Sequence, residues 1–180
     1  KVFILEVMGR HAGWIAAAAE LANDNENTYV HKILIPEIPL DEEAFLAGVQ
    51  KDVEEFGYSV IVASEGLKNQ NGKFYSASDK KDSFGHNQLG GLAPKLANLI
   101  DKKLNYKYHW SVSDYLQRSA RHISSKTDIE QAISVGKAAA NMALNNKNGF
   151  MPVICRDSNS PYSWSIRESE LIHIANKEKT

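Results

Sequence analysis

Short apolar runs alternate with segments of helical periodicity through the first part of the chain, and this alternation limits the fold more than any other feature. Apolar runs at residues 2–7, 30–35 and 58–63 have the length of strands. Between them, apolar residues recur at helical spacing over residues 11–21 and 41–56. This order predicts parallel pairing through right-handed crossovers, and the almost wholly apolar first run predicts a strand buried on both faces.

Further elements follow in the second part of the chain. Residues 92–104 have the pattern of a helix, and residues 106–112 alternate enough to predict a strand with one wetter face. A long helix is expected to open at Thr127. The short runs 150–155 and 162–166 flank a cluster of turn-forming residues, and this pattern is typical of a hairpin.

Together these elements predict a three-layer α/β/α fold with a mostly parallel sheet, followed by a C-terminal hairpin. We expect residues 1–145 to form the α/β domain. Residues 146–180 would form the hairpin and a tail, which pack on that domain or on another part of the protein. The polar stretch 68–87 is expected to be a long loop, and its charge run at 79–82 a solvated segment.

The formal net charge of −1 gives the chain no field that would draw it to nucleic acid or to an anionic membrane. No apolar run approaches the ~20 residues of a membrane helix. Cys155 is the only cysteine, which excludes an internal disulfide and favours a reducing, cytoplasmic compartment. The sequence opens on a strand in progress without a starting methionine, so we expect it to be excised from a longer protein.

The first junction between strand and helix is the expected ligand position, because the carboxyl ends of parallel strands collect helix N-termini and loop amides. Gly9 allows the backbone to turn closely, and Arg10 offers a planar fork for a phosphate or a carboxylate. On spacing alone, an equal alternative is that Gly9 only permits tight packing and Arg10 is a solvated surface residue, because short glycine motifs are weakly specific.

Further polar residues follow other strands at the same predicted edge. Glu37 follows the second strand and could accept hydrogen bonds from sugar hydroxyls, although by itself it fits an exposed loop glutamate. Tyr115 and Arg118 follow the strand at residues 106–112. Two arginines on one rim can bind a dianionic phosphate, so Arg10 and Arg118 together favour a phosphate site.

Other candidates have a simpler explanation. His109, Arg121 and His122 could act directly, but a histidine on a strand or loop is more often a satisfied polar residue than a catalyst. The segment 64–66, Ser-Glu-Gly, could touch a ligand, although ending the strand and turning would explain it. The sequence contains no metal-ligand spacing, nucleophile elbow or Walker A motif.

Four segments, in this order and spacing, resemble the phosphofructokinase family. They are Glu-Val-Met-Gly-Arg-His-Ala-Gly-Trp-Ile-Ala at 6–16, Ile-Pro-Glu at 35–37, Ser-Glu-Gly at 64–66 and Asp-Tyr-Leu-Gln-Arg at 114–118. The likeness runs from about Val2 to about Leu144. It implies a transferase of glycolysis that phosphorylates fructose 6-phosphate on its 1-hydroxyl, with Mg²⁺ bound together with the phosphoryl donor.

The resemblance also implies roles for single residues. Met8, Gly9 and Arg10 would contact fructose 6-phosphate, with Arg10 near the transferring phosphoryl group. Glu37 resembles the family's ligand for sugar hydroxyls. Tyr115 and Arg118 would lie at the end of the pocket, where Arg118 would hold the 6-phosphate. The family's pockets are completed across a subunit interface, which implies a homo-oligomer, either a dimer or a tetramer.

The segment around Tyr115 is more similar to the pyrophosphate-dependent branch, because bacterial ATP-dependent members have histidine at that position and glycines where this chain has Ser119 and Ala120. The family's donor loop and its catalytic Thr-Ile-Asp segment do not occur in this sequence. We therefore expect this chain alone to have no turnover. Three alternatives stay open here: an ATP-dependent enzyme, a non-catalytic sugar-phosphate-binding module, and a generic nucleotide-binding domain, which the missing three-glycine fingerprint disfavours.

Overall fold

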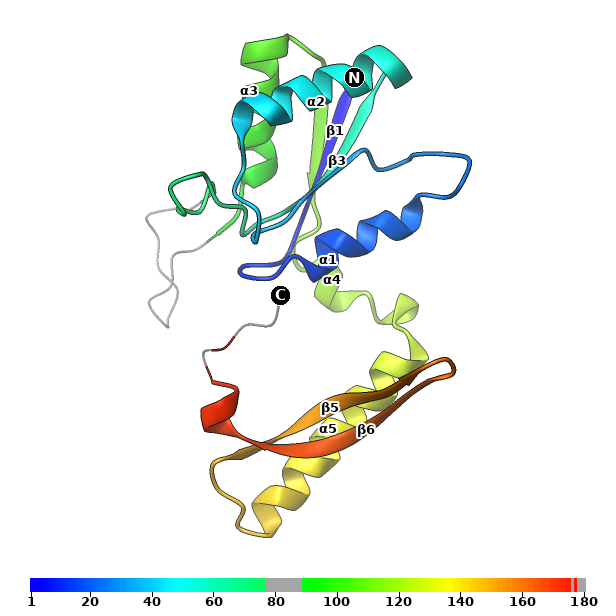
Figure 1. The fold of residues 1–180 in the computed structure, drawn as a ribbon, viewed down its shortest axis with the longest axis vertical. Helices are drawn as coiled ribbons and strands as arrows, with labels where there is room; N and C mark the ends of the chain where they lie inside the picture. The colour runs from blue at the N-terminus through cyan, green and yellow to red at the C-terminus, as the bar shows by residue number, and fades with distance from the viewer. Residues whose placement is uncertain (77–88, 176, 178–180) are drawn as a thin grey trace. The chain divides into compact units, whose positions relative to one another are not determined.

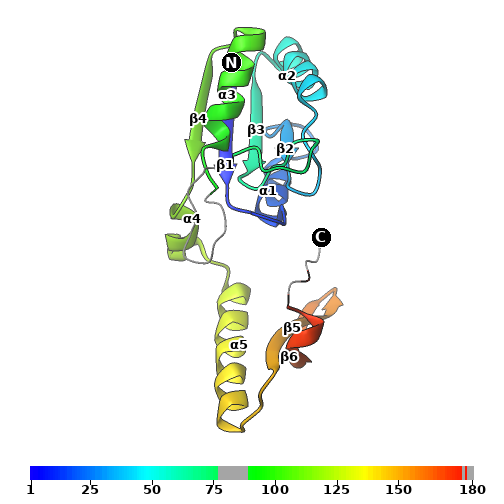
Figure 2. The same cartoon turned by 90° about the vertical axis from the view of Figure 1, so that its left-hand side faces the viewer.

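A four-stranded parallel sheet forms the centre of the first part of the chain in the computed structural model, which describes residues 1–76, 89–175 and 177. The strands are β1 (Val2–Val7), β2 (Lys32–Leu34), β3 (Ser59–Ser64) and β4 (Tyr108–Val112). They lie in the spatial order β2-β3-β1-β4, which is spread out in Figure 2. The predicted parallel pairing is confirmed, and β1 lies between two strands that come much later in the sequence.

The helices that connect these strands are α1 (Trp14–Ala17), its continuation η1 (Ala18–Ala22), α2 (Glu42–Phe56) and α3 (Leu92–Leu104) (Figure 1). Helix α2 has the predicted ends, because the Asp41 carboxylate accepts a hydrogen bond from the Ala44 amide and Gly57 takes a left-handed conformation. The prediction of a helix from residue 11 was wrong. Residues before Trp14 form a turn instead, so α1 begins later.

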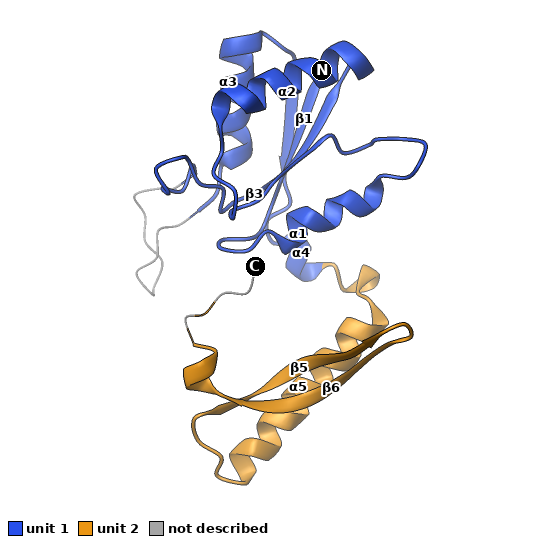
Figure 3. Cartoon of the chain, viewed as in Figure 1, with its two compact units in different colours: residues 1–119, 179–180 blue, residues 120–178 orange. Residues whose placement is uncertain are grey.

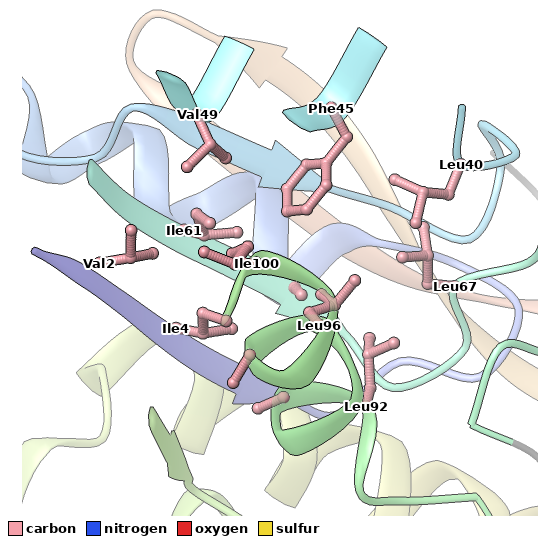
Figure 4. Packing of buried hydrophobic residues seen from close by; sticks show 13 residues of the cluster. Val2, Ile4, Leu40, Phe45, Val49, Ile61, Leu67, Leu92, Leu96 and Ile100 are labelled. Carbon is pink, nitrogen blue, oxygen red and sulfur yellow. The ribbon is translucent and has the colours of Figure 1, made fainter. Parts of the chain in front are cut away.

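Helices cover both faces of the sheet, which confirms the three predicted layers. On one face, Ile4 and Ile61 pack against Phe45 of α2 and Leu96 of α3, as Figure 4 shows. On the other face, Val62 packs in a smaller cluster with Ala16 of α1. Because neighbouring strand residues point to opposite faces, Ile61 and Val62 belong to different layers.

The expectation that the first strand is buried on both faces was wrong at Phe3. Its side chain is 38% exposed, whereas Val2 and Ile4, on the opposite face, are fully buried. The cluster around α1 reaches only Leu5 and Val7 on the Phe3 face of β1. The amino half of that face is therefore not covered by the described residues of the chain.

The last part of the chain forms a helix and a hairpin. After α4 (Leu116–Ser119) and η2 (Arg121–Ile123), helix α5 (Lys126–Leu144) begins at its Ser125 cap. Strands β5 (Phe150–Asn159) and β6 (Tyr162–Glu170) then pair antiparallel, and the short turn η3 (Leu171–His173) follows them. The predicted hairpin is confirmed and is longer than expected, because its pairing continues to the turn at one end and to Glu170 at the other.

The chain divides into two compact units, residues 1–119 with 179–180 and residues 120–178, shown in Figure 3. This division falls before α5, because α5 packs against β5 and β6. The domain boundary expected near residue 145 stays a prediction. Of the predicted loop at 68–87, residues 68–76 fold back through a pairing of Lys68 with Phe74, and the charge run at 79–82 lies outside the described residues.

Across the described ranges, none of the helices has both the length and the apolar character that crossing a bilayer requires.

Candidate functional site

The carboxyl ends of β1 and β3 meet where the chain leaves the sheet in two directions. Helix α1, which follows β1, packs on one face, whereas α3, which follows β3, packs on the other. Neighbouring parallel strands whose helices diverge in this way leave a crevice beyond their carboxyl ends. The Met8–Gly9–Arg10 turn lies at this point, directly after β1.

Hydrogen bonds from the end of β3 hold this turn. The carbonyl oxygen of Gly9 accepts one from the Ser64 hydroxyl at 2.6 Å and another from the Gly66 amide at 3.0 Å. The Gly9 amide donates to a carboxylate oxygen of Glu65 at 3.4 Å. The segment 64–66 therefore fixes both polar groups of the Gly9 backbone, which is a structural task beyond ending the strand.

Two glycines make this close contact possible. Gly9 has a φ of +143°, and a Cβ there would lie 2.4 Å from the Ser64 hydroxyl oxygen. A Cβ on Gly66 would lie 2.0 Å from the carbonyl oxygen of Arg10, which is backbone and cannot swing away. Both positions therefore require glycine for the turn and the β3 end to approach as they do.

The segment after β4 contacts the same turn through a side chain. The Met8 amide donates to Oε1 of Gln117 at 3.2 Å. The Nε2 group of Gln117 donates in turn to the carbonyl oxygen of Asp114, also at 3.2 Å. Because Gln117 belongs to α4, this bond joins the end of β1 to the helix that carries Arg118.

Arg118 of α4 lies close to Tyr115, the residue that precedes this helix. The guanidinium carbon of Arg118 lies 5.9 Å from the centre of the Tyr115 ring, a cation–π distance. Tyr115 itself is 72% exposed. The exposed phenol ring and the guanidinium of Arg118 therefore lie within cation–π distance of each other.

A cleft of about 600 Å³ opens over these elements, within the usual size range of small-ligand pockets. Its lining consists of Met8, Gly9, Arg10, Ile15, Glu65, Leu89, Gln117 and Arg118. Two arginines and one glutamate are thus among the residues that line the same cleft. Guanidinium groups bind phosphate oxygens in a fork, and a carboxylate accepts hydrogen bonds from hydroxyls, so the lining suits a phosphorylated polyol.

The predicted site residues are brought together only in part. Met8, Gly9, Arg10 and Arg118 line the cleft, whereas Glu37 and Tyr115 are not among its lining residues. Glu37 instead accepts a 2.8 Å hydrogen bond from the Gly13 amide at the start of α1. Its Oε2 atom is buried and has no hydrogen-bond partner within the described part of the chain. The sugar-binding role of Glu37 stays a prediction.

The other polar candidates lie on separate elements. His109 is exposed on β4, while Arg121 and His122 belong to η2 in the second compact unit. None of the three lines the cleft at the Met8 turn. No role at this site is therefore assigned to His109, which lies in the same compact unit as the cleft.

A buried carboxylate lies two residues before the turn. Glu6 is 2% exposed, and its carboxylate accepts a 2.8 Å hydrogen bond from the Ala93 amide at the start of α3. Burial raises the pKa of the Glu6 carboxyl above its usual value, and the amides at the start of α3 oppose that shift. The buried Glu6 carboxylate thus links the end of β1 to the start of α3 through a hydrogen bond.

The sequence offered Glu65 only as part of the segment 64–66 that could touch a ligand, and it gave Gln117 no role. The position of Glu65 immediately after β3 was the available signal, because β3 and β1 are neighbours in the sheet. Gln117 lies one residue before Arg118, but its bond to Met8 spans 109 positions and leaves no pattern in a single sequence.

Comparison with known proteins gives a consistent result. Residues 1–143 match the family model described as Phosphofructokinase. The chain is 52% identical to the pyrophosphate–fructose 6-phosphate 1-phosphotransferase of Halomonas elongata, over 99% of this chain and 43% of that protein. It is 34% identical to the ATP-dependent 6-phosphofructokinase of Mycobacterium leprae, over 66% of this chain and 33% of that protein.

A solved structure agrees in fold as well as in sequence. The crystal structure of the pyrophosphate-dependent phosphofructokinase from Marinobacter aquaeolei superposes with a TM-score of 0.80 at 52% identity, covering 99% of this chain and 41% of that one. The chain therefore spans about two fifths of the length of these pyrophosphate-dependent relatives.

Proposed function

This chain belongs to the phosphofructokinase family, and we propose that it is the fructose-6-phosphate-binding part of a pyrophosphate-dependent 6-phosphofructokinase. The complete enzyme would transfer a phosphoryl group from pyrophosphate to the 1-hydroxyl of fructose 6-phosphate. The observation that carries the proposal is the cleft at the Met8–Gly9–Arg10 turn, which Arg10, Arg118 and Glu65 all line.

The choice of donor rests on the relatives. Two relatives named for pyrophosphate match at 52% identity along nearly all of this chain, whereas a relative named for ATP matches at 34% over 66% of it. Tyr115, which distinguishes the segment from bacterial ATP-dependent members, supports the same choice. An ATP-dependent enzyme is the second candidate.

The proposed roles follow from charge and position. Arg118, stacked on Tyr115, would hold the 6-phosphate. Glu65 would accept hydrogen bonds from sugar hydroxyls, and Glu37 is the second candidate for that role. Arg10 would stabilise the charge that spreads over the transferring phosphoryl oxygens, since phosphoryl transfer depends mostly on positioning and on charge neutralisation.

In the reaction, a bond forms between the 1-oxygen of the sugar and the transferred phosphorus, and the bond from that phosphorus to the bridging oxygen of pyrophosphate breaks. The 1-hydroxyl proton would pass to a carboxylate outside this chain. The residues of this chain would therefore orient the acceptor and neutralise charge, and the chain alone would have no turnover.

Magnesium would enter with pyrophosphate. In residues 1–76, 89–175 and 177, no cluster of three or more histidine, cysteine, aspartate or glutamate side chains could hold a metal ion. We propose that pyrophosphate and residues outside this chain supply most of the metal ligands, and we derive no step of the reaction from the metal. When bound, Mg²⁺ supplies charge neutralisation on the phosphate oxygens.

The same proposal includes a homo-oligomer, a dimer or a tetramer, with pockets completed between subunits. It also includes a cytoplasmic location, which the single cysteine favours. Neither nucleic acid nor a membrane is a proposed partner, because the net charge of −1 offers no general attraction to them.

Assays on the full-length protein test the donor and the acceptor separately. With fructose 6-phosphate and Mg²⁺, we expect fructose 1,6-bisphosphate to form with pyrophosphate and not with ATP. Formation with ATP alone would replace the first candidate by the second. Binding of fructose 6-phosphate in calorimetry without turnover on either donor would instead favour a non-catalytic sugar-phosphate-binding module.

A further inference from the structure

The Met8–Gly9–Arg10 turn and helix α4 belong to elements that are far apart in the sequence, yet one side chain joins them. Gln117 accepts the Met8 amide hydrogen at 3.2 Å through Oε1 and donates to the Asp114 carbonyl at 3.2 Å through Nε2. Both ends of its amide group are therefore used within the protein. In this arrangement Gln117 lines the cleft without needing the ligand to satisfy it.

The Met8 bond has a different role from those that hold Gly9. Ser64, Glu65 and Gly66 attach the turn to β3, but none of them attaches it to α4. The Met8 amide is partly buried, so it would lose its partner at a cost if Gln117 were replaced by an apolar residue. The bond from Gln117 to Met8 therefore links the turn that carries Arg10 to the helix that carries Arg118.

Resting on the proposed function, we propose that Gln117 is a positioning residue that sets the separation of Arg10 and Arg118 and thereby the fit of the sugar phosphate. Arg10 lies two residues from one end of the bond, and Arg118 is the next residue after the other. A small rotation of α4 would displace Arg118 relative to Arg10. Gln117 itself needs no contact with the substrate.

Replacing Gln117 by methionine in the full-length enzyme tests this assignment, because methionine keeps the length of the side chain and removes both hydrogen bonds. We expect the KM for fructose 6-phosphate to rise about five- to tenfold, the loss typical of one hydrogen bond, and kcat to fall with it. The KM for pyrophosphate should stay within about twofold, because the bond between Gln117 and Met8 does not contribute to the binding of pyrophosphate. A merely structural role would lower the amount of active enzyme and leave both KM values unchanged.

The matched control is Gln50→Met. Gln50 is exposed on α2 and its side chain donates to Glu54 at 2.8 Å, so the same chemical change occurs away from the cleft. We expect wild-type KM values for this variant. An equal rise in the KM for fructose 6-phosphate in both variants would overturn the positioning role.

Hydrogen–deuterium exchange separates this inference from the proposed function. In Gln117→Met, exchange in the peptide that contains Met8 should accelerate, and in Gln50→Met it should not. If the wild-type protein has no activity on fructose 6-phosphate, the proposed function fails while the exchange result still decides the positioning role.

Should Gln117→Met not fold, Gln117→Glu keeps the acceptor for Met8, and its Met8 peptide should retain slow exchange. Unchanged exchange in Gln117→Met, or fast exchange in a folded Gln117→Glu, would overturn the inference.

Discussion

The Ser64 hydroxyl donates a 2.6 Å hydrogen bond to the carbonyl oxygen of Gly9, 55 positions earlier in the sequence. Ser64 is fully buried, so this bond is not exchanged with water. It holds the first residue after Met8 against the end of β3. The position of Gly9 in the cleft lining is therefore held by a small buried hydroxyl that does not itself line the cleft.

Replacing Ser64 by alanine should weaken the fold and the site modestly. The Gly9 carbonyl keeps the Gly66 amide as a partner, so we expect a loss of about 1 kcal/mol in the free energy of unfolding. The kcat/KM for fructose 6-phosphate should fall a few-fold in the full-length enzyme. Chemical denaturation and steady-state kinetics measure the two effects, and an unchanged unfolding midpoint would count against the buried bond.

Replacing Gly66 by alanine should damage the site more severely. The new Cβ would meet the carbonyl oxygens of Arg10 and Gly9 at 2.0 and 2.4 Å, so the turn must shift. A displacement of that kind can cost on the order of a hundredfold in kcat/KM. Gly136→Ala is the matched control, because its Cβ would meet no atom within 4 Å on α5, and it should keep wild-type activity.

Replacing each of the two cleft arginines should change different kinetic constants. We expect Arg118→Ala to raise chiefly the KM for fructose 6-phosphate, by roughly ten- to a hundredfold, as for a lost charged hydrogen bond. Arg10→Ala should lower kcat as well, because its proposed charge stabilisation acts in the transition state. Steady-state kinetics of the full-length enzyme with each substrate varied in turn measure both effects.

Arg156→Ala is the control for the stacked arginine, since Arg156 lies over the Tyr162 ring at 5.5 Å in the hairpin as Arg118 lies over Tyr115. Its removal should leave both KM values near those of the wild type. Unchanged kinetics in both cleft variants would refute the proposed site.

Glu6 gives a prediction for the pH dependence of stability. Burial raises the pKa of its carboxyl above 4.5 in the folded protein, so the protonated form favours folding. This contribution is complete below the unfolded pKa and is lost as the pH rises through the folded pKa. Because Glu6→Gln cannot ionise, its stability relative to the wild type should improve as the pH rises from about 4.5 through that window.

Thermal midpoints of the two proteins at matched pH values measure this difference. The comparison cancels the other carboxyl groups, which both proteins share. A difference that stays constant with pH, or that turns against Glu6→Gln as the pH rises, would contradict the buried ionisable group.

Elements with local signals were predicted well from the sequence. Asp41 and Gly57 mark the two ends of α2 through capping chemistry that is complete within a few residues. The Met8–Gly9–Arg10 turn was also located, because it follows an apolar strand directly. Helix α3 was predicted with its observed bounds for the same kind of reason.

Features that depend on distant partners were not predicted. Helix α4 has only four residues, too short for a periodic pattern, and its Gln117 accepts a hydrogen bond from Met8, 109 positions away in the sequence. Phe3 looked buried because it lies in an apolar run, but coverage of its face is decided by where α1 packs. Glu65 lies at the site because β3, which it follows, pairs with β1 in the sheet.

The way the turn is held sets a lower limit on what must be transplanted to move this site into another protein. Bonds to Gly9 come from the end of β3, and the bond to Met8 comes from α4 beyond the end of β4. A grafted loop that copied only the Met-Gly-Arg letters would lack all of these donors and acceptors. A designer would have to import the ends of three neighbouring strands as one piece, with Gly66 and Gln117 included.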